Sequence, residues 1–357
     1  MTLILSNEQI SEILTMAECI DVLEEAYVEL AAGRGITRLR SDSLTPAKMP
    51  DAFYGLKSMD GVAPKFGVGA VRINSDIITW PEINGKRRRV KVPAAPNRRW
   101  VGLVLLFSTE TGEPLAIFPD GVVQRARVGA TNGLGAKYLA REDAGTIGLL
   151  GSGWQAGGQL MAITAVRSIE KVRCFSPTKE NRENFCREWS GRLNIEVIPV
   201  DSTESAIKGV DIVLCGSSSM DYIFFEKWFK PGMHISSIKL AEIEPAAIQR
   251  ADIVAIHCRA GMPLYSATSD LSEVEKVRGK GWDVQQSIDF DTLPTLPDLI
   301  TGKAIGRTSV EQTTCFLNNL GLGYQFAAVG ALVYRKAKDQ GVGKELPTDW
   351  FTEDVHP

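Results

Sequence analysis

The stretch Thr146–Ile163, TIGLLGSGWQAGGQLMAI, decides the expected fold of this chain. Its apolar start predicts a buried strand, which leads through a glycine-rich turn into a helix. The turn has the G-x-G-x-x-A form of a dinucleotide-binding fingerprint, and N–H groups at the helix start would bind the phosphates. The first glycine allows the tight turn, the second lets the backbone approach a pyrophosphate, and the alanine lets the helix pack closely on the strand. The predicted cofactor-binding residues of the turn are Gly151, Ser152, Gly153, Trp154, Gln155 and Ala156.

Strand and helix patterns alternate after this turn, and they strengthen a motif that is weak by itself. Short apolar runs are separated by helical segments from residue 146 to residue 256. This alternation predicts a doubly wound parallel sheet of the Rossmann type, in the α/β class. The expected strands are Ile147–Leu150, Val172–Phe175, Ile195–Pro199, Ile212–Gly216, His234–Ile238 and Ile253–Ile256.

The flanking parts of the chain have a different pattern. Helices are expected at Met16–Ala32 and Val122–Leu139, with mainly strands between residues 53 and 118. The mostly apolar stretch Thr313–Lys338 is predicted to be a long helix. We therefore expect the N-terminal part and the C-terminal helix to form one α+β domain, with the nucleotide domain inserted between them. The expected division is residues 1–125 with 310–357 for the first domain and residues 126–309 for the second.

Bulk composition excludes several classes of protein. The 357 residues are 44% hydrophobic and 23% charged, with a formal net charge of −3, so nothing global favours binding to nucleic acid or an anionic membrane. No apolar run approaches the roughly 18 residues of a transmembrane helix. The N-terminus lacks the basic region of a secretory signal, and we expect a cytoplasmic protein.

Cysteines and histidines show no spacing that is typical of a metal site, and we expect no metal. The cysteines stand singly, mostly in apolar runs, which favours buried free thiols. These residues are Cys19, Cys174, Cys186, Cys215, Cys258 and Cys315, with His234, His257 and His356.

A basic run, Asn84–Lys91 (NGKRRRVK), lies among the expected strands. Its Asn-Gly pair is a hairpin turn signal. The run has no interleaved aromatic residues and the rest of the chain is not basic. A solvated hairpin arm is therefore favoured over a nucleic-acid site.

The end of the second expected strand bears on the choice of cofactor. An acidic residue at this place usually binds the ribose 2′-hydroxyl of NAD, and none stands directly at the strand tip. Hydroxyl and basic side chains there favour NADP(H) over NAD(H), although Thr178 could instead only cap the next helix. Ser217, after the fourth strand, is expected to line the nicotinamide side. The residues expected around a 2′-phosphate are Ser176, Thr178, Lys179 and Arg182.

Six segments in this order resemble the ornithine cyclodeaminase/mu-crystallin family, over about residues 5 to 343. The Gly-x-Gly-x-Gln-Ala turn is more specific than a general dinucleotide loop. The resemblance implies a homodimer whose subunits combine a nucleotide domain with a dimerisation and substrate domain. It also implies nicotinamide chemistry at the α-carbon of amino or imino acids: ornithine cyclisation, reduction of cyclic ketimines, or interconversion of oxo acids and amino acids. The segments are Leu39–Asp42, Arg127–Ala130, Gly151–Ala156, Thr178–Asn181, Lys230–Ile235 and Thr313–Gly321.

The resemblance also implies roles for three arginines. Arg40 and Arg127 match the two arginines of the family that bind the substrate carboxylate, a role that suits a bidentate guanidinium. Each could instead form an ion pair within the protein. The catalytic lysine of the family would fall in Val68–Asp76, where the best match is Arg72. Arginine stays protonated near neutral pH, so it cannot transfer the proton.

A second departure concerns the catalytic aspartate of cyclodeaminases. Its place, shortly after the expected strand that begins at His234, holds Ala241 or Glu242. Mu-crystallin lacks this aspartate too and is credited with ketimine reduction, so the departure argues against ornithine cyclisation more than against hydride transfer. Proton transfer stays open among several groups and water. The groups that could transfer the proton are Lys57, Lys65, Lys239, Glu242 and Asp76. The residues predicted to be catalytic are Arg72, Lys57 and Glu242.

The leading hypothesis is an NAD(P)H-dependent oxidoreductase that acts at the α-carbon of an imino, oxo or amino acid. Arg40 and Arg127 would hold the carboxylate, and Arg72 would add charge or bind a second anionic group. Three arginines suggest an acidic substrate, such as a dicarboxylate. Two alternatives stay open: an ornithine cyclodeaminase-type ammonia lyase that recycles its cofactor, and a catalytically silent NAD(P)H-binding protein like mu-crystallin.

Overall fold

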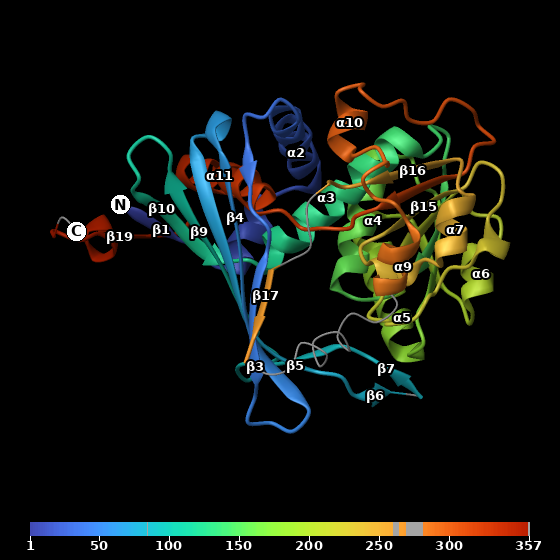
Figure 1. The fold of residues 1–357 in the computed structure, drawn as a ribbon, viewed down its shortest axis with the longest axis horizontal. Helices are drawn as coiled ribbons and strands as arrows, with labels where there is room; N and C mark the ends of the chain where they lie inside the picture. Colours follow the sequence, from blue (N-terminus) through green and yellow to red (C-terminus); the bar gives the residue numbers. More distant parts are fainter. Residues whose placement is uncertain (84, 260–263, 269–280, 356–357) are drawn as a thin grey trace.

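Two β-sheets lie side by side, each covered by helices, in the computed structural model of the chain (Figure 1). The structure describes residues 1–83, 85–259, 264–268 and 281–355. Asn84 of the expected hairpin turn and His356 lie outside these residues. In the described part of the chain, no helix is long and apolar enough to cross a membrane.

The first sheet confirms the predicted Rossmann-type fold. Its strands are all parallel, in the order β13-β12-β11-β14-β15-β18-β16. The strand order reverses between β11 and β14, and open parallel sheets bind ligands at such a point. The strands are β11 (Thr146–Leu150), β12 (Lys171–Phe175), β13 (Glu196–Pro199), β14 (Ile212–Cys215), β15 (His234–Ser237), β16 (Ile253–Ile256) and β18 (Thr314–Leu317).

Strand β18 is a correction to the expected helix at Thr313–Lys338. Thr314–Leu317 forms a fully buried strand between β15 and β16, and the helix α11 begins only at Gly323 and ends at Gln340. A strand buried on both faces is apolar at every position, so its period does not distinguish it from a buried helix. β17 (Leu264–Ala267) and β18 each pair across the expected domain division, which stays a prediction.

The second sheet is ten-stranded and largely antiparallel, with the main order β17-β3-β4-β5-β9-β10-β1-β19. Its two central hairpin strands, β4 and β5, are 12 residues long and are paired along their whole length. The strands are β1 (Thr2–Ile4), β2 (Ile36–Thr37), β3 (Ser41–Pro46), β4 (Ala52–Ala63), β5 (Val68–Thr79), β8 (Val90–Val92), β9 (Val101–Ser108), β10 (Pro114–Pro119), β17 and β19 (Lys344–Leu346).

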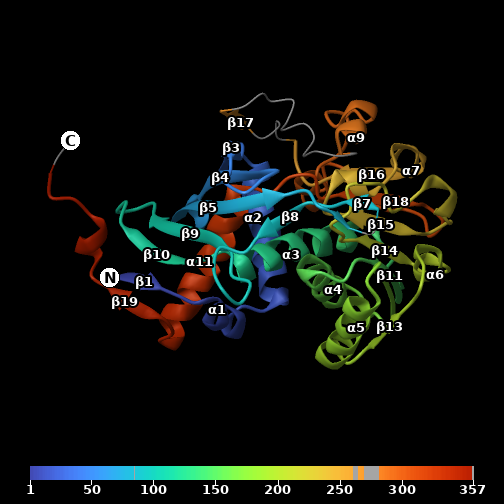
Figure 2. The same ribbon diagram turned by 90° about the horizontal axis from the view of Figure 1, so that it is seen from below.

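Helices cover one face of this second sheet and leave the other bare (Figures 1 and 2). α2 (Met16–Ala31) and α11 pack with the inward residues of β4 and β5 in one hydrophobic core. The capping box expected at Ser6 and Gln9, which starts α1, is present. The remaining helices are α1 (Asn7–Ile13), α3 (Gly121–Leu139), α4 (Trp154–Val166), α5 (Lys179–Leu193), α6 (Thr203–Ile207), α7 (Pro245–Arg250), α9 (Gly281–Ser287) and α10 (Leu296–Ile300).

Helix α3 joins the two sheets. It packs on α2 and α11 at the second sheet, and on α4, β15 and β18 at the first. Its many small residues allow this close approach, as the sequence indicated. A Cβ atom on Gly129 would overlap the backbone of Gly158 in α4. The relative position of α3 and α4 is therefore set by direct backbone contact.

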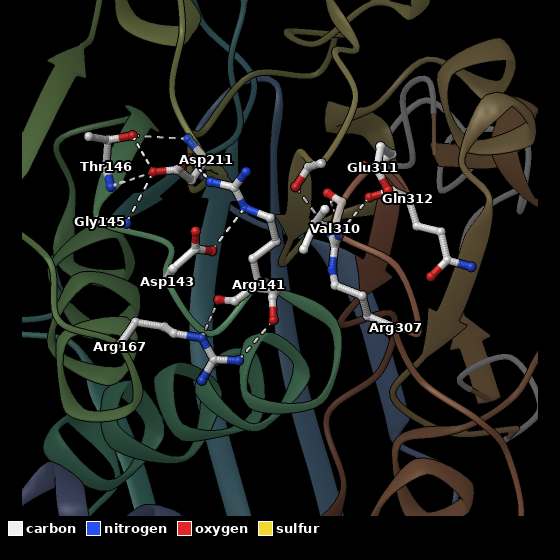
Figure 3. Close-up of polar contacts among 12 residues, drawn as sticks. Arg141, Asp143, Gly145, Thr146, Arg167, Asp211, Arg307, Val310, Glu311 and Gln312 are labelled. Atoms are coloured by element: carbon white, nitrogen blue, oxygen red, sulfur yellow. Dashed lines mark hydrogen bonds and ion pairs between the residues drawn. The ribbon is translucent and has the colours of Figure 1, made fainter.

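Arginine side chains fasten the C-terminal end of α3 (Figure 3). Arg167 donates hydrogen bonds to the carbonyl oxygens of Ala136, Lys137, Ala140 and Arg141, at 2.7–2.9 Å. The last carbonyls of a helix generally lack helical partners and carry the negative end of its dipole, although that of Ala136 also accepts from the N–H of Ala140. Nearby, Asp211 pairs with Arg141 and accepts from the backbone N–H of Gly145 and Thr146. Arg307 acts in a similar way, because its guanidinium donates hydrogen bonds to the carbonyl oxygens of Leu139, Gly232 and Gln312.

Replacing Arg167 with alanine is expected to lower the free energy of unfolding by about 2–4 kcal/mol, because several charge-assisted hydrogen bonds are lost together. Urea denaturation followed by circular dichroism measures the change. Arg187→Ala removes an exposed arginine from α5 and should change the stability by less than about 0.5 kcal/mol. Equal midpoints for the two variants would show that Arg167 does not stabilise the end of α3.

Candidate active site

The glycine turn between β11 and α4 has the geometry that a dinucleotide needs. Gly151 adopts φ +132°, and a Cβ there would overlap the carbonyl oxygen of Gly216. Gly153 is the N-cap of α4, and a Cβ on it would have no neighbour within 4 Å. Space is therefore open directly in front of the first N–H groups of α4. Ala156 is buried and packs against Gly216, as the fingerprint requires.

A cavity of about 500 Å³ lies in front of this turn, within the usual size of a small-molecule site. It is bounded by the turn, the end of β12, the segment after β14 and one residue of the basic run. The open helix start and the size of this space fit the phosphates of NAD(P)(H). The polar and glycine residues that line it include Gly151, Ser152, Gly153, Ser176, Thr178, Gly216, Ser217, Ser218, Ser219 and Arg88.

The residues expected around a 2′-phosphate are used in different ways. Ser176 and Thr178 line the cavity, and the Ser176 hydroxyl lies 2.8 Å from that of Ser152. Arg182 is buried, donates to the carbonyl of Ser176 at 3.2 Å and pairs with Asp201. Lys179 is exposed at the start of α5. The guanidinium of Arg182 thus supports the end of β12, and the preference for NADP(H) stays a prediction.

Trp154 and Gln155 face α3 with their side chains. The Trp154 indole donates to the carbonyl of Gly121 at 3.3 Å, and Arg125 stacks 3.6 Å above its ring. The Gln155 amide donates to Gln124 at 2.5 Å. Neither side chain lines the cavity, so their expected contribution to cofactor binding rests on their backbone N–H groups.

Glu242 supports the segment after β14. It is fully buried and accepts from the backbone N–H of Ser217 at 2.6 Å and from its hydroxyl at 2.8 Å. Burial raises the pKa of Glu242. Lys239 donates to the carbonyl of Ser219 at 2.5 Å, which ties down the same segment. Glu242 does not line the cavity itself, but its hydrogen bonds hold Ser217 in the cavity wall.

The second sheet carries buried polar residues on the same face that elsewhere forms its hydrophobic core. Residues of β5 alternate, and Arg72, Asn74 and Asp76 point to this face beyond the apolar positions. Lys57 points there from β4. These four side chains are called the polar wall below. Arg72 forms an ion pair with Asp120 at 2.6 Å, and Asn74 donates to the same carboxylate at 3.3 Å.

Lys57 has an unusual environment within the polar wall. Its ammonium lies 2.9 Å from Asp76, which also pairs with Lys91 at 2.8 Å. Burial and the nearby Arg89 lower the pKa of Lys57 to about 8. Lys65, the other lysine considered from the sequence, pairs with Glu25 on α2 and takes no part in the wall.

The two arginines expected to bind the carboxylate differ in how many hydrogen bonds their guanidinium groups already make within the protein. Arg40 makes two hydrogen bonds of 2.7 Å to Asp42. Arg127 is buried, donates to Gln325 at 3.0 Å and lies 5.0 Å from the ring centroid of Phe326. Among the described residues, its Nε has no hydrogen-bond partner. Burial and the neighbouring Arg72 lower the pKa of Arg127 to about 10, so it keeps its charge and can bind an anion.

A buried hydrogen-bond chain orients Arg127, and sequence reasoning missed it. Gln325 accepts from Arg127 and donates to the Tyr27 hydroxyl at 2.9 Å. His257 donates through Nδ1 to the carbonyl of Leu320 at 2.6 Å, so its Nε2 accepts from Tyr27 at 2.8 Å. Burial lowers the pKa of His257 to about 4, which keeps the ring neutral. A glutamine within the apolar first half of α11 was the available signal.

The basic run forms the expected hairpin, and one of its residues also takes part in the site. β6 (Glu82–Ile83) and β7 (Lys86–Arg87) form its hairpin, which reaches toward the first sheet (Figure 1). Arg88 forms a β-bridge with Ser219 and lines the cavity. The segment from β6 to β8, called the arm below, thus closes one side of the site.

Comparison with known proteins places this chain in the class of NAD(P)-dependent oxidoreductases. This result confirms the predicted type of cofactor and the predicted enzyme class. Residues 1–341 match the model of the ornithine cyclodeaminase/mu-crystallin family, and the chain belongs to that family.

Three relatives extend along almost the whole chain. Delta(1)-pyrroline-2-carboxylate reductase of Bacillus cereus (strain ATCC 10987 / NRS 248) is 28% identical, with 97% of this chain and 99% of the relative covered. Alanine dehydrogenase of Archaeoglobus fulgidus is 25% identical, with coverage of 97% and 98%. The solved structure of Thermococcus litoralis Delta(1)-pyrroline-2-carboxylate reductase, in complex with NADH and L-proline, has a TM-score of 0.79. It is 25% identical, and the match covers 97% of this chain and 100% of that one.

Two glycine substitutions should separate folding from cofactor binding. Gly151→Ala places a Cβ against Gly216 at a positive φ, so we expect a loss of stability of about 2 kcal/mol or more. Gly153→Ala meets open space, so it should keep the melting temperature and weaken NAD(P)H binding at least about tenfold by blocking the pyrophosphate. Differential scanning fluorimetry and NAD(P)H fluorescence titration measure the two effects. Unchanged NAD(P)H affinity in Gly153→Ala would contradict the assigned phosphate site.

Proposed function

We propose that the protein transfers hydride between NAD(P)H and the α-carbon of an imino acid, which interconverts an imino acid and an amino acid. The observation that carries this proposal is Arg127, a buried guanidinium with an unsatisfied Nε. A buried charge with so few partners is costly unless an anion completes its hydrogen bonds. The names of the relatives, reductases of pyrroline-2-carboxylate and an alanine dehydrogenase, support a substrate with an α-carboxylate.

In the proposed complex, Arg127 binds the α-carboxylate while Gln325 fixes the direction of its guanidinium. Bidentate contact would fix the substrate plane, which aligns the α-carbon for transfer. Arg40 adds positive charge but is already engaged by Asp42. The bound nicotinamide supplies or accepts the hydride. The first turn of α4 would hold the pyrophosphate, and Ser217, held by Glu242, would border the ring.

The proposed proton donor is Lys57. Imine reduction adds a hydride to carbon and a proton to nitrogen, so a group that titrates near neutral pH must deliver the proton. Arg72 is paired with Asp120, and arginine side chains do not transfer protons near neutral pH. Glu242 is tied to Ser217. Lys57 is buried in the polar wall with a pKa of about 8, and Asp76 orients its ammonium. After transfer, the neutral amine regains a proton from solvent.

A homodimer and a cytoplasmic location are further parts of the proposal. The face of the second sheet that no helix covers exposes apolar side chains, including Leu56, Val101 and Leu103 at 44%, 43% and 39%. A second copy of the chain would bury them. Light scattering tests the dimer, with Leu103→Asp as the disrupting variant. Comparison of KM for NADH and NADPH tests the expected preference for NADP(H).

Steady-state assays of the purified protein test the proposed reaction. Stoichiometric NAD(P)H oxidation with Δ1-pyrroline-2-carboxylate, or with an oxo acid and ammonium, would support it. Release of ammonia from ornithine with only a catalytic amount of cofactor would support a cyclodeaminase instead. Tight NAD(P)H binding without turnover would support a silent binding protein. Arg127→Ala should lower kcat/KM by about 10²-fold or more, because a charge-assisted carboxylate contact is lost. Full activity of this variant would contradict the carboxylate assignment.

The pH dependence should identify Lys57. Its ammonium donates in imine reduction and is present below a pKa of about 8, so kcat/KM for reduction should fall as the pH rises through 8. Amino acid oxidation uses the neutral amine and should show the opposite slope. Lys57→Met should lower kcat about 10²- to 10⁴-fold and abolish this inflection. Lys65→Met, a matched change outside the polar wall, should keep both the rate and the inflection.

A further inference from the structure

Two neighbouring arginines in the arm point to different parts of the site. The arm is extended around Arg88, whose backbone bridges to Ser219. Consecutive side chains of an extended segment point to opposite sides. Arg88 lines the cofactor cavity, whereas the charges that act on Arg89 come from Arg40, Asp42 and Asp76 on the second sheet. Arg89 therefore belongs to the substrate side of the crevice.

The basic neighbours of Arg89 already have partners. Arg40 pairs with Asp42, and Lys57 pairs with Asp76. Lys239, whose pKa is lowered by burial and also by Arg89, donates to a carbonyl of the first sheet. Within the described part of the chain, Arg89 itself forms no ion pair at 4.0 Å or less and no side-chain hydrogen bond that would use its guanidinium.

The local electrostatics favour an incoming anion. Although Arg89 is partly exposed, the surrounding protein and the Arg40 guanidinium lower its pKa. Guanidinium groups that repel each other are stabilised when a carboxylate lies between or beside them. Arg72, which the sequence suggested for a second anionic group, is occupied by Asp120. Arg40 acts electrostatically on both Arg127 and Arg89, so both guanidinium groups lie near it.

We propose that Arg89 binds a second carboxylate of the substrate, so that the preferred substrate is a dicarboxylic imino or amino acid. This inference rests on the proposed function: Arg127 binds the α-carboxylate and Arg89 the carboxylate of the side chain. The arm thereby contributes to both ligands, through Arg88 to the cofactor and through Arg89 to the substrate. The bound dicarboxylate would in turn hold the arm against the crevice.

Matched substrate pairs test the role of Arg89. The pairs are oxaloacetate and pyruvate, each with ammonium and NAD(P)H, and L-aspartate and L-alanine with NAD(P)⁺. The wild-type protein should prefer the dicarboxylic member of each pair. Arg89→Ala should lower kcat/KM for that member about 10- to 100-fold and change the monocarboxylic value less than about threefold, since one charge-assisted contact is removed.

Two control variants separate this effect from cofactor binding and from net charge. Arg88→Ala should raise KM for NAD(P)H and leave the ratio between paired substrates unchanged. Lys48→Ala removes a positive charge from the exposed turn between β3 and β4, so it should leave the ratio unchanged too. A fall in the ratio with Lys48→Ala equal to that with Arg89→Ala would overturn the assignment.

Failure of this inference and failure of the proposed function give different results. Turnover of monocarboxylic substrates with no dicarboxylate preference, and no effect of Arg89→Ala on the ratio, would overturn the inference and leave the function intact. Absence of turnover with every imino and amino acid would overturn the function. Thermal shifts of the NAD(P)⁺-saturated protein with succinate and propionate then decide the inference. A larger shift with succinate that Arg89→Ala abolishes supports it, and equal shifts overturn it.

Discussion

The backbone contact between α3 and α4 is the constraint on which the site depends. Gly129 leaves no room for a side chain against Gly158, so the two helices approach as closely as their backbones allow. α4 carries the phosphate-binding turn at its start, and α3 carries Arg127. The distance between cofactor and substrate carboxylate is therefore set by rigid helix packing rather than by loops. The contact from Trp154 to Gly121 fixes the same two helix starts.

Charge pairing explains which basic side chains already have an acidic partner and which remain available to bind an anion. The polar wall lies in a part of the sheet face that would otherwise be apolar, so each charge there needs a partner. Asp120 satisfies Arg72, and Asp76 satisfies Lys57. Arg127 is the buried exception, because its Nε has no hydrogen-bond partner among the described residues. Arg89 is exposed, and a carboxylate could bind either guanidinium. Buried ion pairs of this kind specify geometry more than they add stability.

Two consecutive segments, both distant in sequence from the parallel sheet, complete the crevice. The long hairpin of β4 and β5 carries the polar wall, and Arg88 in the arm that follows it lines the cofactor cavity. The arm then crosses to the first sheet at Ser219. A site built between two sheets in this way can exclude water from the transferred hydride once both ligands are bound.

The sequence by itself determined the dinucleotide turn, the parallel sheet and the family, because glycine spacing and strand–helix alternation are local patterns. It did not determine β18, since a strand buried on both faces has no period that separates it from a helix. Nor did it determine which charged residues are free: the sequence suggested that Arg72 binds a second anionic group, and only the structure shows that Asp120, 48 residues away, already occupies it. Tertiary structure decided this because the energy of a buried charge depends on which groups the fold brings within a few ångströms of it.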